Sequence, residues 1–598
     1  MRTNRIIRIV TILLLIAVAY LLFTLIQSYD RQRAELVKLQ KQQQASRGTF
    51  RYDPAVYVSG NTFANSQHFD PDASVNGTLT GVLLTDPPSL NPLLAGEASA
   101  SMVYGLCSLS LAERDWEHPE KFLPALAESW EISPDKKTYR LKLRSGVMWH
   151  DFIDPESGRA IPPREFTASD VKFTIDVIMD PEVNCAALRG YYADLEKVEI
   201  INDYEVVFHW KKPYYGSLSS TLGLTPLPRH FYCPAGAAFN AKKFNEDHLR
   251  NRMIVGCGPF RFVSWEKSKR IVLERNELYP GIKFKAAPAL QKYVLEIIKI
   301  PNTQLQSLKA GKVSMLNLTP EQWQNQTPAK VFPADKFTKL RNPGTGYSYI
   351  GYNLQRRCFA DAQTRRALTM LVNRQKILDE IMFGCGRIAT GPFIPGSVYC
   401  DPALKPHPFD PAAARRLLAQ AGWRDTDGDG ILERDGEKFS FTMLQISGSV
   451  TQMKTLPVIQ RDFAAAGIEM KLQVIEWSVL LERLKNRNFD ACNLGWTGSF
   501  DPDLYQIFHS SQSEKDGSNF VSFKNDELDK KILELRQEFD PEKRIRLCHE
   551  MGRILHEEQP YTFMFYPDEL MIISNDFGNV KLFPAGVCPQ SFTRKEKK

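Results

Sequence analysis

The fold class is decided by the stretch D-P-A-A-A-R-R-L-L-A-Q-A-G-W (410–423) and by the two segments directly after it. An aspartate and a proline open a run with helical spacing, and a glycine near its end is a typical helix terminator. The turn D-T-D-G-D-G (425–430) then leads to F-S-F-T-M-L-Q-I (439–446), which alternates like a strand. A helix succeeded directly by a strand is the building unit of mixed α/β domains.

The same alternation recurs toward the N-terminus. T-L-T-G-V-L-L-T (78–85) and T-Y-R-L-K-L-R (138–144) predict strands, and T-A-S-D-V-K-F-T-I-D-V-I-M (167–179) predicts a capped helix. A chain of 598 residues is too long for one core, so several α/β domains are expected. The net charge of +7, from 76 basic and 69 acidic residues, does not indicate nucleic-acid binding.

The N-terminus predicts a membrane anchor. Arginines at positions 2, 5 and 8 precede an uncharged apolar run over 9–26, with no A-x-A cleavage motif and no cysteine for lipid attachment. We interpret 1–8 as a cytoplasmic N-terminus, 9–26 as a single transmembrane helix and 27–75 as a polar stalk and linker, with the bulk of the chain in the periplasm or extracellular space. The alternative is a cleaved signal peptide.

The cysteines and histidines give no coherent catalytic or zinc site. The ten cysteines include no C-x-x-C pair, which argues against zinc-ribbon and thioredoxin-like sites. Cys385 and Cys400 are the nearest candidates for a disulfide, and isolated thiols are the alternative. His549-Glu550 lacks the second histidine of a zincin motif, and W-H-D (149–151) comes after a strand, where a structural role is favoured. We therefore predict a binding protein without enzymatic activity.

The acidic turn begins like a calcium-binding EF-hand loop. Asp425, Asp427 and Asp429 alternate before a glycine at the sixth position, but the twelfth position is a glycine and a strand stands in place of a second helix. We predict a turn without metal or other cofactor, in which the aspartates bind their own backbone. The alternative is a structural calcium ion held by these three aspartates with Glu433 or Asp435.

Blocks along the chain resemble one known family. The longest is P-A-L-A-E-S-W-E-I-S-P-D-K-K-T-Y-R-L-K-L-R-S-G-V-M-W-H-D (124–151), and further blocks come in order at 166–174, 256–265, 275–279, 349–353, 365–368, 410–430 and 495–503. Together they resemble the family 5 extracellular solute-binding proteins, which are the oligopeptide- and dipeptide-binding receptors of ABC importers.

The resemblance implies a type II periplasmic-binding-protein-like α/β fold with two lobes and an additional domain. Lobe I would comprise 76–103, 227–343 and 562–598, domain II would comprise 104–226, and lobe III would comprise 344–561. The ligand would be enclosed between lobes I and III, and hinge closure would create the form that a permease recognises.

The resemblance also implies the ligand-binding residues. Trp477 and Trp496 match cavity-lining tryptophans, and the peptide receptors place an ammonium-binding aspartate where this chain has Ser499. Asp501 is the candidate substitute for that carboxylate, and Asn493 stands where a carboxylate-binding arginine would be. The remaining candidates lie beside the second tryptophan, at the lobe crossing and after L-N-P: Thr497, Gly498, Asn353, Gly96, Glu97 and Ala98.

The predicted function is that of a monomeric, membrane-tethered receptor that delivers peptides or peptide-like solutes to an ABC transporter permease. Because Ser499 carries no charge, a receptor for another solute, such as a nickel chelate, an opine or a sugar, is an alternative. A peptide sensor or chaperone without a transporter is a third hypothesis.

Overall fold

The computed structural model describes residues 56–57, 62–247, 249–498, 500–514, 517–584 and 586–596. The predicted anchor at 9–26 and most of the predicted stalk lie outside these residues. Within the described part of the chain, no helix has the length and hydropathy needed to cross a bilayer. Residues 55–598 make up one compact unit, which contains both lobes and domain II.

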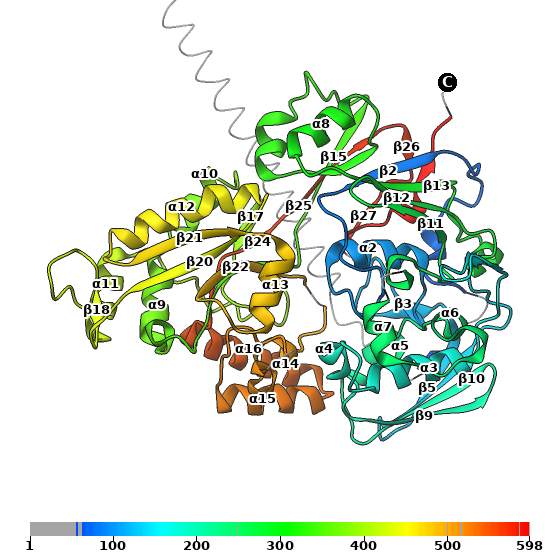
Figure 1. Ribbon diagram of the computed structural model, residues 1–598, viewed down its shortest axis with the longest axis horizontal. Helices are drawn as coiled ribbons and strands as arrows, with labels where there is room; N and C mark the ends of the chain where they lie inside the picture. The colour runs from blue at the N-terminus through cyan, green and yellow to red at the C-terminus, as the bar shows by residue number, and fades with distance from the viewer. Residues whose placement is uncertain are drawn as a thin grey trace, which may run out of the picture. The chain divides into compact units, whose positions relative to one another are not determined.

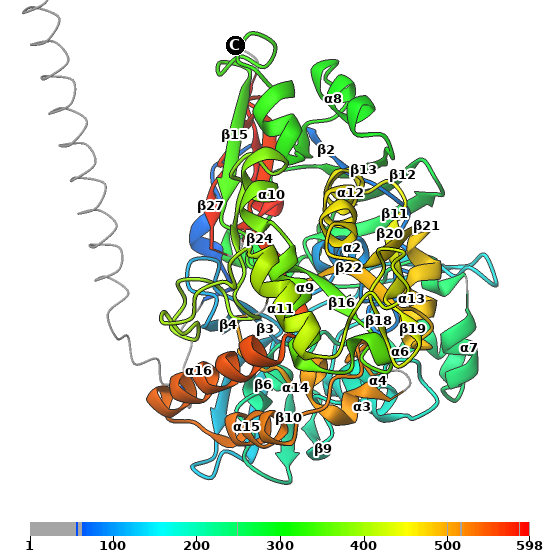
Figure 2. The ribbon, with the colours of Figure 1, turned by 90° about the vertical axis from the view of Figure 1, so that its left-hand side faces the viewer.

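Lobe III is built on a five-stranded sheet with the order β21 (Glu469–Ile475), β20 (Ser440–Ile446), β22 (Ala491–Trp496), β16 (Tyr347–Tyr352) and β23 (Tyr561–Phe563). The pairs β20–β21 and β20–β22 are parallel, whereas β16 is antiparallel to both of its neighbours. Its helices are α9 (Ala362–Leu371), α10 (Arg374–Glu380), α11 (Pro411–Gln420), α12 (Val450–Ala464), α13 (Trp477–Lys485), α14 (Tyr505–Phe508), α15 (Asp526–Gln537) and α16 (Pro541–Glu558). Figure 1 shows α12 and α13 beside these strands, and Figure 2 shows α9 next to α11.

The predicted helix–turn–strand unit is confirmed in this lobe. The Asp410 side chain caps α11 by accepting a 2.8 Å hydrogen bond from the backbone N–H of Ala413, and Pro411 occupies the first turn. Gly422 has a φ of 91°, the left-handed conformation that ends a helix. After the turn, a short hairpin of β18 (Glu433–Arg434) and β19 (Glu437–Lys438) precedes β20.

Lobe I contains two sheets. One has the order β11 (Phe260–Glu266), β12 (Arg270–Arg275), β13 (Lys292–Ile297) and β2 (Thr78–Leu83), and the other has the order β14 (Met315–Asn317), β25 (Glu569–Ser574) and β15 (Phe337–Asn342). The helices are α2 (Ala98–Cys107) and α8 (Pro301–Lys309). Chain segments from both ends of the compact unit therefore pair with strands from its middle, β2 with β13 and β25 with β14.

Domain II is an antiparallel sheet with the order β1 (Val56–Tyr57), β5 (Ala127–Ile132), β6 (Thr138–Leu143), β10 (Glu205–Trp210) and β9 (Leu195–Asn202). Helix α3 (Ala168–Met179) packs on β9 and β10, and its predicted N-terminus is confirmed by a capping box between Thr167 and Asp170. The smaller elements of this region are β3 (Ala112–Arg114), β4 (Phe122–Pro124), β7 (Phe152–Ile153), β8 (Ala160–Ile161), α4 (Ala186–Arg189), α5 (Ser217–Leu222), α6 (Arg229–Tyr232) and α7 (Ala241–Glu246).

Core packing extends across both predicted borders of domain II. Helix α2 continues past 103 because Leu106 and Cys107 bury against the lobe I core. On the other side, Leu227 and Phe244 pack with Phe173 of α3, so this stretch stays with domain II until β11 begins.

Two segments cross between lobes I and III. The first, at 343–346, joins β15 to β16, and the second comes after β24 (Phe565–Pro567), which pairs with β17 (Gly386–Ile388). The return to lobe I therefore comes after Pro567, later than the predicted 562, because β23 and β24 stay paired within lobe III. A Cβ on Gly344 would lie 2.0 Å from the Pro567 carbonyl oxygen, so the two crossings lie in contact.

All ten cysteines belong to the described residues, and each is a free thiol. Cys385 is buried and Cys400 is half-buried. Of the two alternatives left open by the sequence, the structure has isolated thiols rather than a Cys385–Cys400 disulfide.

Candidate functional site

Trp496 lies at the end of β22 in a wall of aromatic side chains. Its indole N–H donates to the Tyr561 hydroxyl over 3.4 Å. The Trp496 ring is nearly parallel to those of Tyr349 and Phe520, with centroid distances of 6.4 Å and 5.8 Å. Trp496 itself is half-buried, so part of the indole in this aromatic wall (Trp496, Tyr349, Tyr561 and Phe520) remains accessible.

Trp477 is the first residue of α13, and it is also half-buried. It packs against the same apolar core that supports Trp496. The two predicted tryptophans therefore belong to one cluster of lobe III, and neither is sealed inside it.

The loop after Trp496 contacts the first lobe crossing, at 343–346. Thr497 and Gly498 are exposed, and Ser499 lies outside the described residues. A Cβ on Gly498 would lie 2.4 Å from the carbonyl carbon of Thr345. Only a glycine fits this approach, so the loop that carries the predicted ligand residues rests directly on the segment that joins the lobes.

Asp501 contacts domain II. Its Oδ2 accepts a 2.5 Å charge-assisted hydrogen bond from Arg114 and a 2.9 Å hydrogen bond from the Ser219 hydroxyl. The side chains of Arg114 and Asp501 are 30% and 29% exposed, so this ion pair is partly shielded from water. The predicted substitute for the missing aspartate thus has a cationic partner within the protein.

Asp503, two residues further on, is held in a similar way. Its Oδ2 accepts a 3.0 Å hydrogen bond from the Tyr214 hydroxyl of domain II and lies 3.3 Å from Arg536 Nε. The Arg536 guanidinium is 4.3 Å from the ring centroids of both Tyr214 and Tyr505. Figure 1 shows α14 beside α4, where this contact between lobe III and domain II continues.

Glu97 is the residue before α2 in lobe I, between the exposed residues Gly96 and Ala98. The carboxyl is half-buried, and among the described residues its Oε2 has no hydrogen-bond partner. Burial raises the pKa of Glu97, while its own backbone N–H and the charge of Lys485 in α13 of lobe III act in the opposite direction. Lobe I therefore carries an incompletely satisfied carboxylate whose pKa responds to the charge of a lobe III lysine.

Two asparagines near the lobe III strands have structural partners. The Asn353 side chain is buried, and its amide donates to the carbonyls of Arg487 and Phe489 over 3.0 Å and 2.9 Å. Asn493 donates to the Tyr349 carbonyl over 3.0 Å. The two hydrogens of the Asn353 amide are thus both bonded to backbone carbonyls of the segment after α13.

The histidines considered for chemistry also have structural contacts. His150 is buried, its Nδ1 accepts from the Gly256 N–H over 3.2 Å, and burial lowers its pKa to about 4. His549 contacts the Val398 carbonyl over 3.0 Å. The W-H-D stretch therefore connects domain II, through hydrogen bonds of His150, to the glycine-containing segment that precedes β11.

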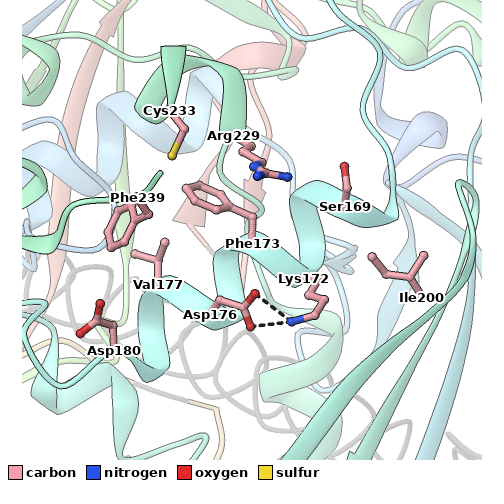
Figure 3. Close-up of a pocket in the computed structure, with 10 residues that line it drawn as sticks. All are labelled: Ser169, Lys172, Phe173, Asp176, Val177, Asp180, Ile200, Arg229, Cys233 and Phe239. Carbon is pink, nitrogen blue, oxygen red and sulfur yellow. Dashed lines mark hydrogen bonds and ion pairs between the residues drawn. The ribbon is translucent and has the colours of Figure 1, made fainter. Parts of the chain in front are cut away.

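A surface hollow of about 420 Å³ lies elsewhere, beside α3 of domain II. Figure 3 shows Phe173, Val177 and Phe239 on its apolar side and the Lys172–Asp176 ion pair at its edge. None of the residues predicted to bind ligand lines it.

Sequence reasoning missed the domain II side of this region. Arg114, Ser219 and Tyr214 contact aspartates that lie almost three hundred or more residues further along the chain. No local sequence motif identifies these three residues, because their partners belong to lobe III and become neighbours only in the folded protein.

Comparison with known proteins agrees with this architecture. The family of bacterial extracellular solute-binding proteins, family 5 Middle, matches residues 121–519. The oligopeptide-binding protein AppA of Bacillus subtilis (strain 168) is 31% identical over 520 residues, which cover 85% of this chain and 89% of AppA. The di/tripeptide-binding protein 2 of Pseudomonas aeruginosa (strain UCBPP-PA14) is 27% identical over 533 residues, with 86% and 87% covered.

A solved structure shows the same fold. The oligopeptide-binding protein AppA from Bacillus subtilis, in complex with a nonapeptide, superposes with a TM-score of 0.78 and 28% identity, covering 88% of this chain and all of that one (100%). The α/β fold of this class of binding protein, predicted from the sequence blocks, is thereby confirmed.

Proposed function

Because the chain belongs to the bacterial extracellular solute-binding proteins of family 5, we propose that it captures peptides between lobes I and III and delivers them to the permease of an ABC importer. The two similar proteins above bind oligopeptides and di- or tripeptides by name. The proposal involves binding and release without a chemical step.

The observation that carries the proposal is the aromatic wall around Trp496. It is a flat apolar surface, fixed by hydrogen bonding and stacking, at the end of a strand that leads into the loop touching the lobe crossing. Such a surface covers peptide side chains of different shapes without selecting one of them. Trp477 on α13 would extend the apolar surface, and Thr497 with Gly498 would border the peptide backbone.

For the peptide ammonium we propose Glu97. Asp501 already faces Arg114 and Ser219, whereas the Glu97 carboxylate retains an oxygen without a partner among the described residues. An ammonium brought against a half-buried carboxylate forms a charge-assisted hydrogen bond in a shielded setting. Glu97 would therefore supply from lobe I the charge that Ser499 does not supply from lobe III. Gly96 and Ala98 would border the ligand through their backbone.

We also propose where the receptor acts. The apolar run at 9–26 would tether it, as a monomer, to the cytoplasmic membrane with the compact unit on the outer side. A tether keeps the receptor at a high effective concentration beside its permease.

Native mass spectrometry of the full chain, released from detergent micelles, tests the binding function. We expect co-purified peptides that are lost after partial unfolding and refolding and that rebind on addition. A bound pool made up only of non-peptide solutes would contradict the peptide proposal.

The role of Glu97 is tested with Glu97→Gln, which removes the charge and keeps the shape. We expect affinity for peptides with a free N-terminus to fall by about 2 kcal/mol or more, as measured by calorimetry, and affinity for N-acetylated peptides to change little. Because burial raises the pKa of Glu97, its ionised form destabilises the folded state as pH rises, so the variant should also be slightly more stable at neutral pH.

Asp501→Asn is the matched control for this experiment. If it abolishes the preference for free N-termini and Glu97→Gln does not, the ammonium site is at Asp501 and the assignment to Glu97 is wrong. If the unaltered protein binds no peptide at all, the receptor function itself is wrong.

A further inference from the structure

The acidic turn between α11 and β18 has the backbone hydrogen bonds expected from the sequence. Asp425 accepts from the N–H groups of Gly428 and Gly430, Asp427 accepts from Asp429, and Asp429 accepts from Ile431. Arg424 and Glu433 close its base through two backbone hydrogen bonds of 3.0 Å and 2.7 Å. Gly428 and Gly430 have φ values of 80° and 87°. These left-handed residues fold the loop back on itself and turn alternate side chains toward one point.

Four carboxylates gather at that point. Asp425, Asp427, Asp429 and Glu433 each place an oxygen within 4.8 Å of the others. Figure 1 shows β18 beside α11 in lobe III. Carboxylate oxygens in a flexible loop are the ligands that Ca²⁺ prefers, and like charges at this spacing repel one another unless a cation lies between them.

Glu433 provides an independent indication of a ligand. It is only 7% exposed, in contrast to the three exposed aspartates. Its Oε2 accepts from the N–H and the hydroxyl of Thr426 over 2.7 Å and 2.8 Å. Its Oε1 is buried and has no hydrogen-bond partner among the described residues. A buried anionic oxygen without a partner, on a residue that belongs to a carboxylate cluster, is costly unless a cation satisfies it.

The neighbouring acidic residues are arranged differently. Asp435 and Glu437 both pair with Arg357, over 3.1 Å in each case. Of the two residues considered as a fourth ligand, the structure therefore brings Glu433 to the cluster and turns Asp435 away from it.

Lys438 is the only basic side chain with an ion pair to these four carboxylates among the described residues. Its ammonium lies 3.2 Å from Asp427 and also contacts Asp429. One ammonium cannot neutralise four carboxylates, and it reaches two of the exposed aspartates rather than Glu433. A divalent ion at the centre would compete with it.

We propose that Asp425, Asp427, Asp429 and Glu433 bind a calcium ion that fixes the corner between α11 and β18. Water would complete the coordination, as is usual for exposed calcium loops. The corner is close to Trp423, which is 3% exposed and stacks on Phe439 with a centroid distance of 4.3 Å. That position allows the indole to transfer excitation energy to a lanthanide bound in the loop.

Calcium calorimetry and terbium luminescence on the full chain in detergent, after treatment with a chelator, test the proposal. We expect one calcium ion per chain and terbium emission excited through tryptophan, with calcium suppressing that emission. Glu433→Gln and Asp427→Asn should each weaken calcium binding at least about tenfold. Lys438→Met should strengthen it, because the competing ammonium is gone.

Asp435→Asn is the matched control, since it removes a carboxylate from the same hairpin but not from the cluster. It should leave calcium affinity unchanged. Retention of peptide binding by every variant shows that each has folded. Absence of calcium binding at millimolar concentration, or equal affinities in Glu433→Gln and the unaltered chain, would overturn the proposal.

Discussion

Two aspartate-containing loops of lobe III have similar sequences and opposite arrangements. In D-T-D-G-D-G (425–430) the carboxylates turn toward one another, and Lys438 is the basic side chain paired with them. In F-D-P-D (500–503) each aspartate faces an arginine: Asp501 faces Arg114 of domain II, and Asp503 faces Arg536 of α15.

The difference lies in where the positive charge comes from. The glycines of the first loop adopt left-handed conformations that allow a tight local fold and bring acidic groups together. In the first loop the carboxylates have backbone N–H groups, Thr426 and Lys438 as partners, whereas in the second loop the partners come from distant parts of the chain. Spacing of aspartates alone does not distinguish these two outcomes.

The largest expected effect is that of Arg536→Ala. Arg536 is 11% exposed and Asp503 is 20% exposed, so removing the arginine leaves a poorly hydrated carboxylate without its charge partner. We expect the free energy of unfolding, measured in urea, to fall by about 3 kcal/mol. Arg546→Ala, on the exposed side of α16, is the matched control, and an equally small loss in both variants would show that the arginine partner is unimportant.

A smaller effect is expected for the pair between domain II and lobe III. Because Arg114 and Asp501 are partly exposed, a double-mutant cycle with Arg114→Gln and Asp501→Asn should give a coupling energy of about 1 kcal/mol in the unfolding free energy. If the pair fixes domain II against lobe III, both single variants should weaken peptide binding to a similar degree. Weakening by Asp501→Asn alone would indicate a direct contact of Asp501 with the ligand.

The smallest effect concerns the exposed lysine of the first loop. Hydrogen bonding to Lys438 lowers the pKa of Asp429, so the stabilising effect of this pair is present above the ordinary aspartate pKa and is lost as pH falls through the lowered one. In chelator, Lys438→Met should raise the Asp429 pKa, monitored by NMR, without a measurable change in the unfolding midpoint. An unchanged pKa would mean that the ammonium does not occupy the loop in solution.

Local signals were sufficient for the elements and for the family. The Asp410–Pro411 cap, the Thr167–Asp170 box and the alternation at 138–144 predicted α11, α3 and β6, and the structure has all three. These features depend on neighbouring residues, so the sequence contains the information needed to recognise them.

Features that depend on distant contacts could not be predicted. The return to lobe I comes after Pro567 because β24 finds a partner in β17, which no local pattern in that segment indicates. Likewise, Glu433 rather than Asp435 joins the three aspartates, because Asp435 forms an ion pair with Arg357. Arg357 lies far before this turn in the sequence, so the pair could not be predicted locally. For the candidate site, Trp496 was found by resemblance, whereas its supporting ring Phe520 and the Asp501 partner Arg114 required the folded arrangement.

Backbone contacts at Gly498 and Gly344 couple the lobe crossings to the loop after Trp496. Gly498 rests on Thr345 of the first crossing, and Gly344 of that crossing rests on Pro567 of the second. Rotation of the lobes about these segments must therefore move the 497–501 loop as well, because the backbones are in direct contact. A fluorophore placed at the exposed Thr497 would therefore report changes in the hinge angle.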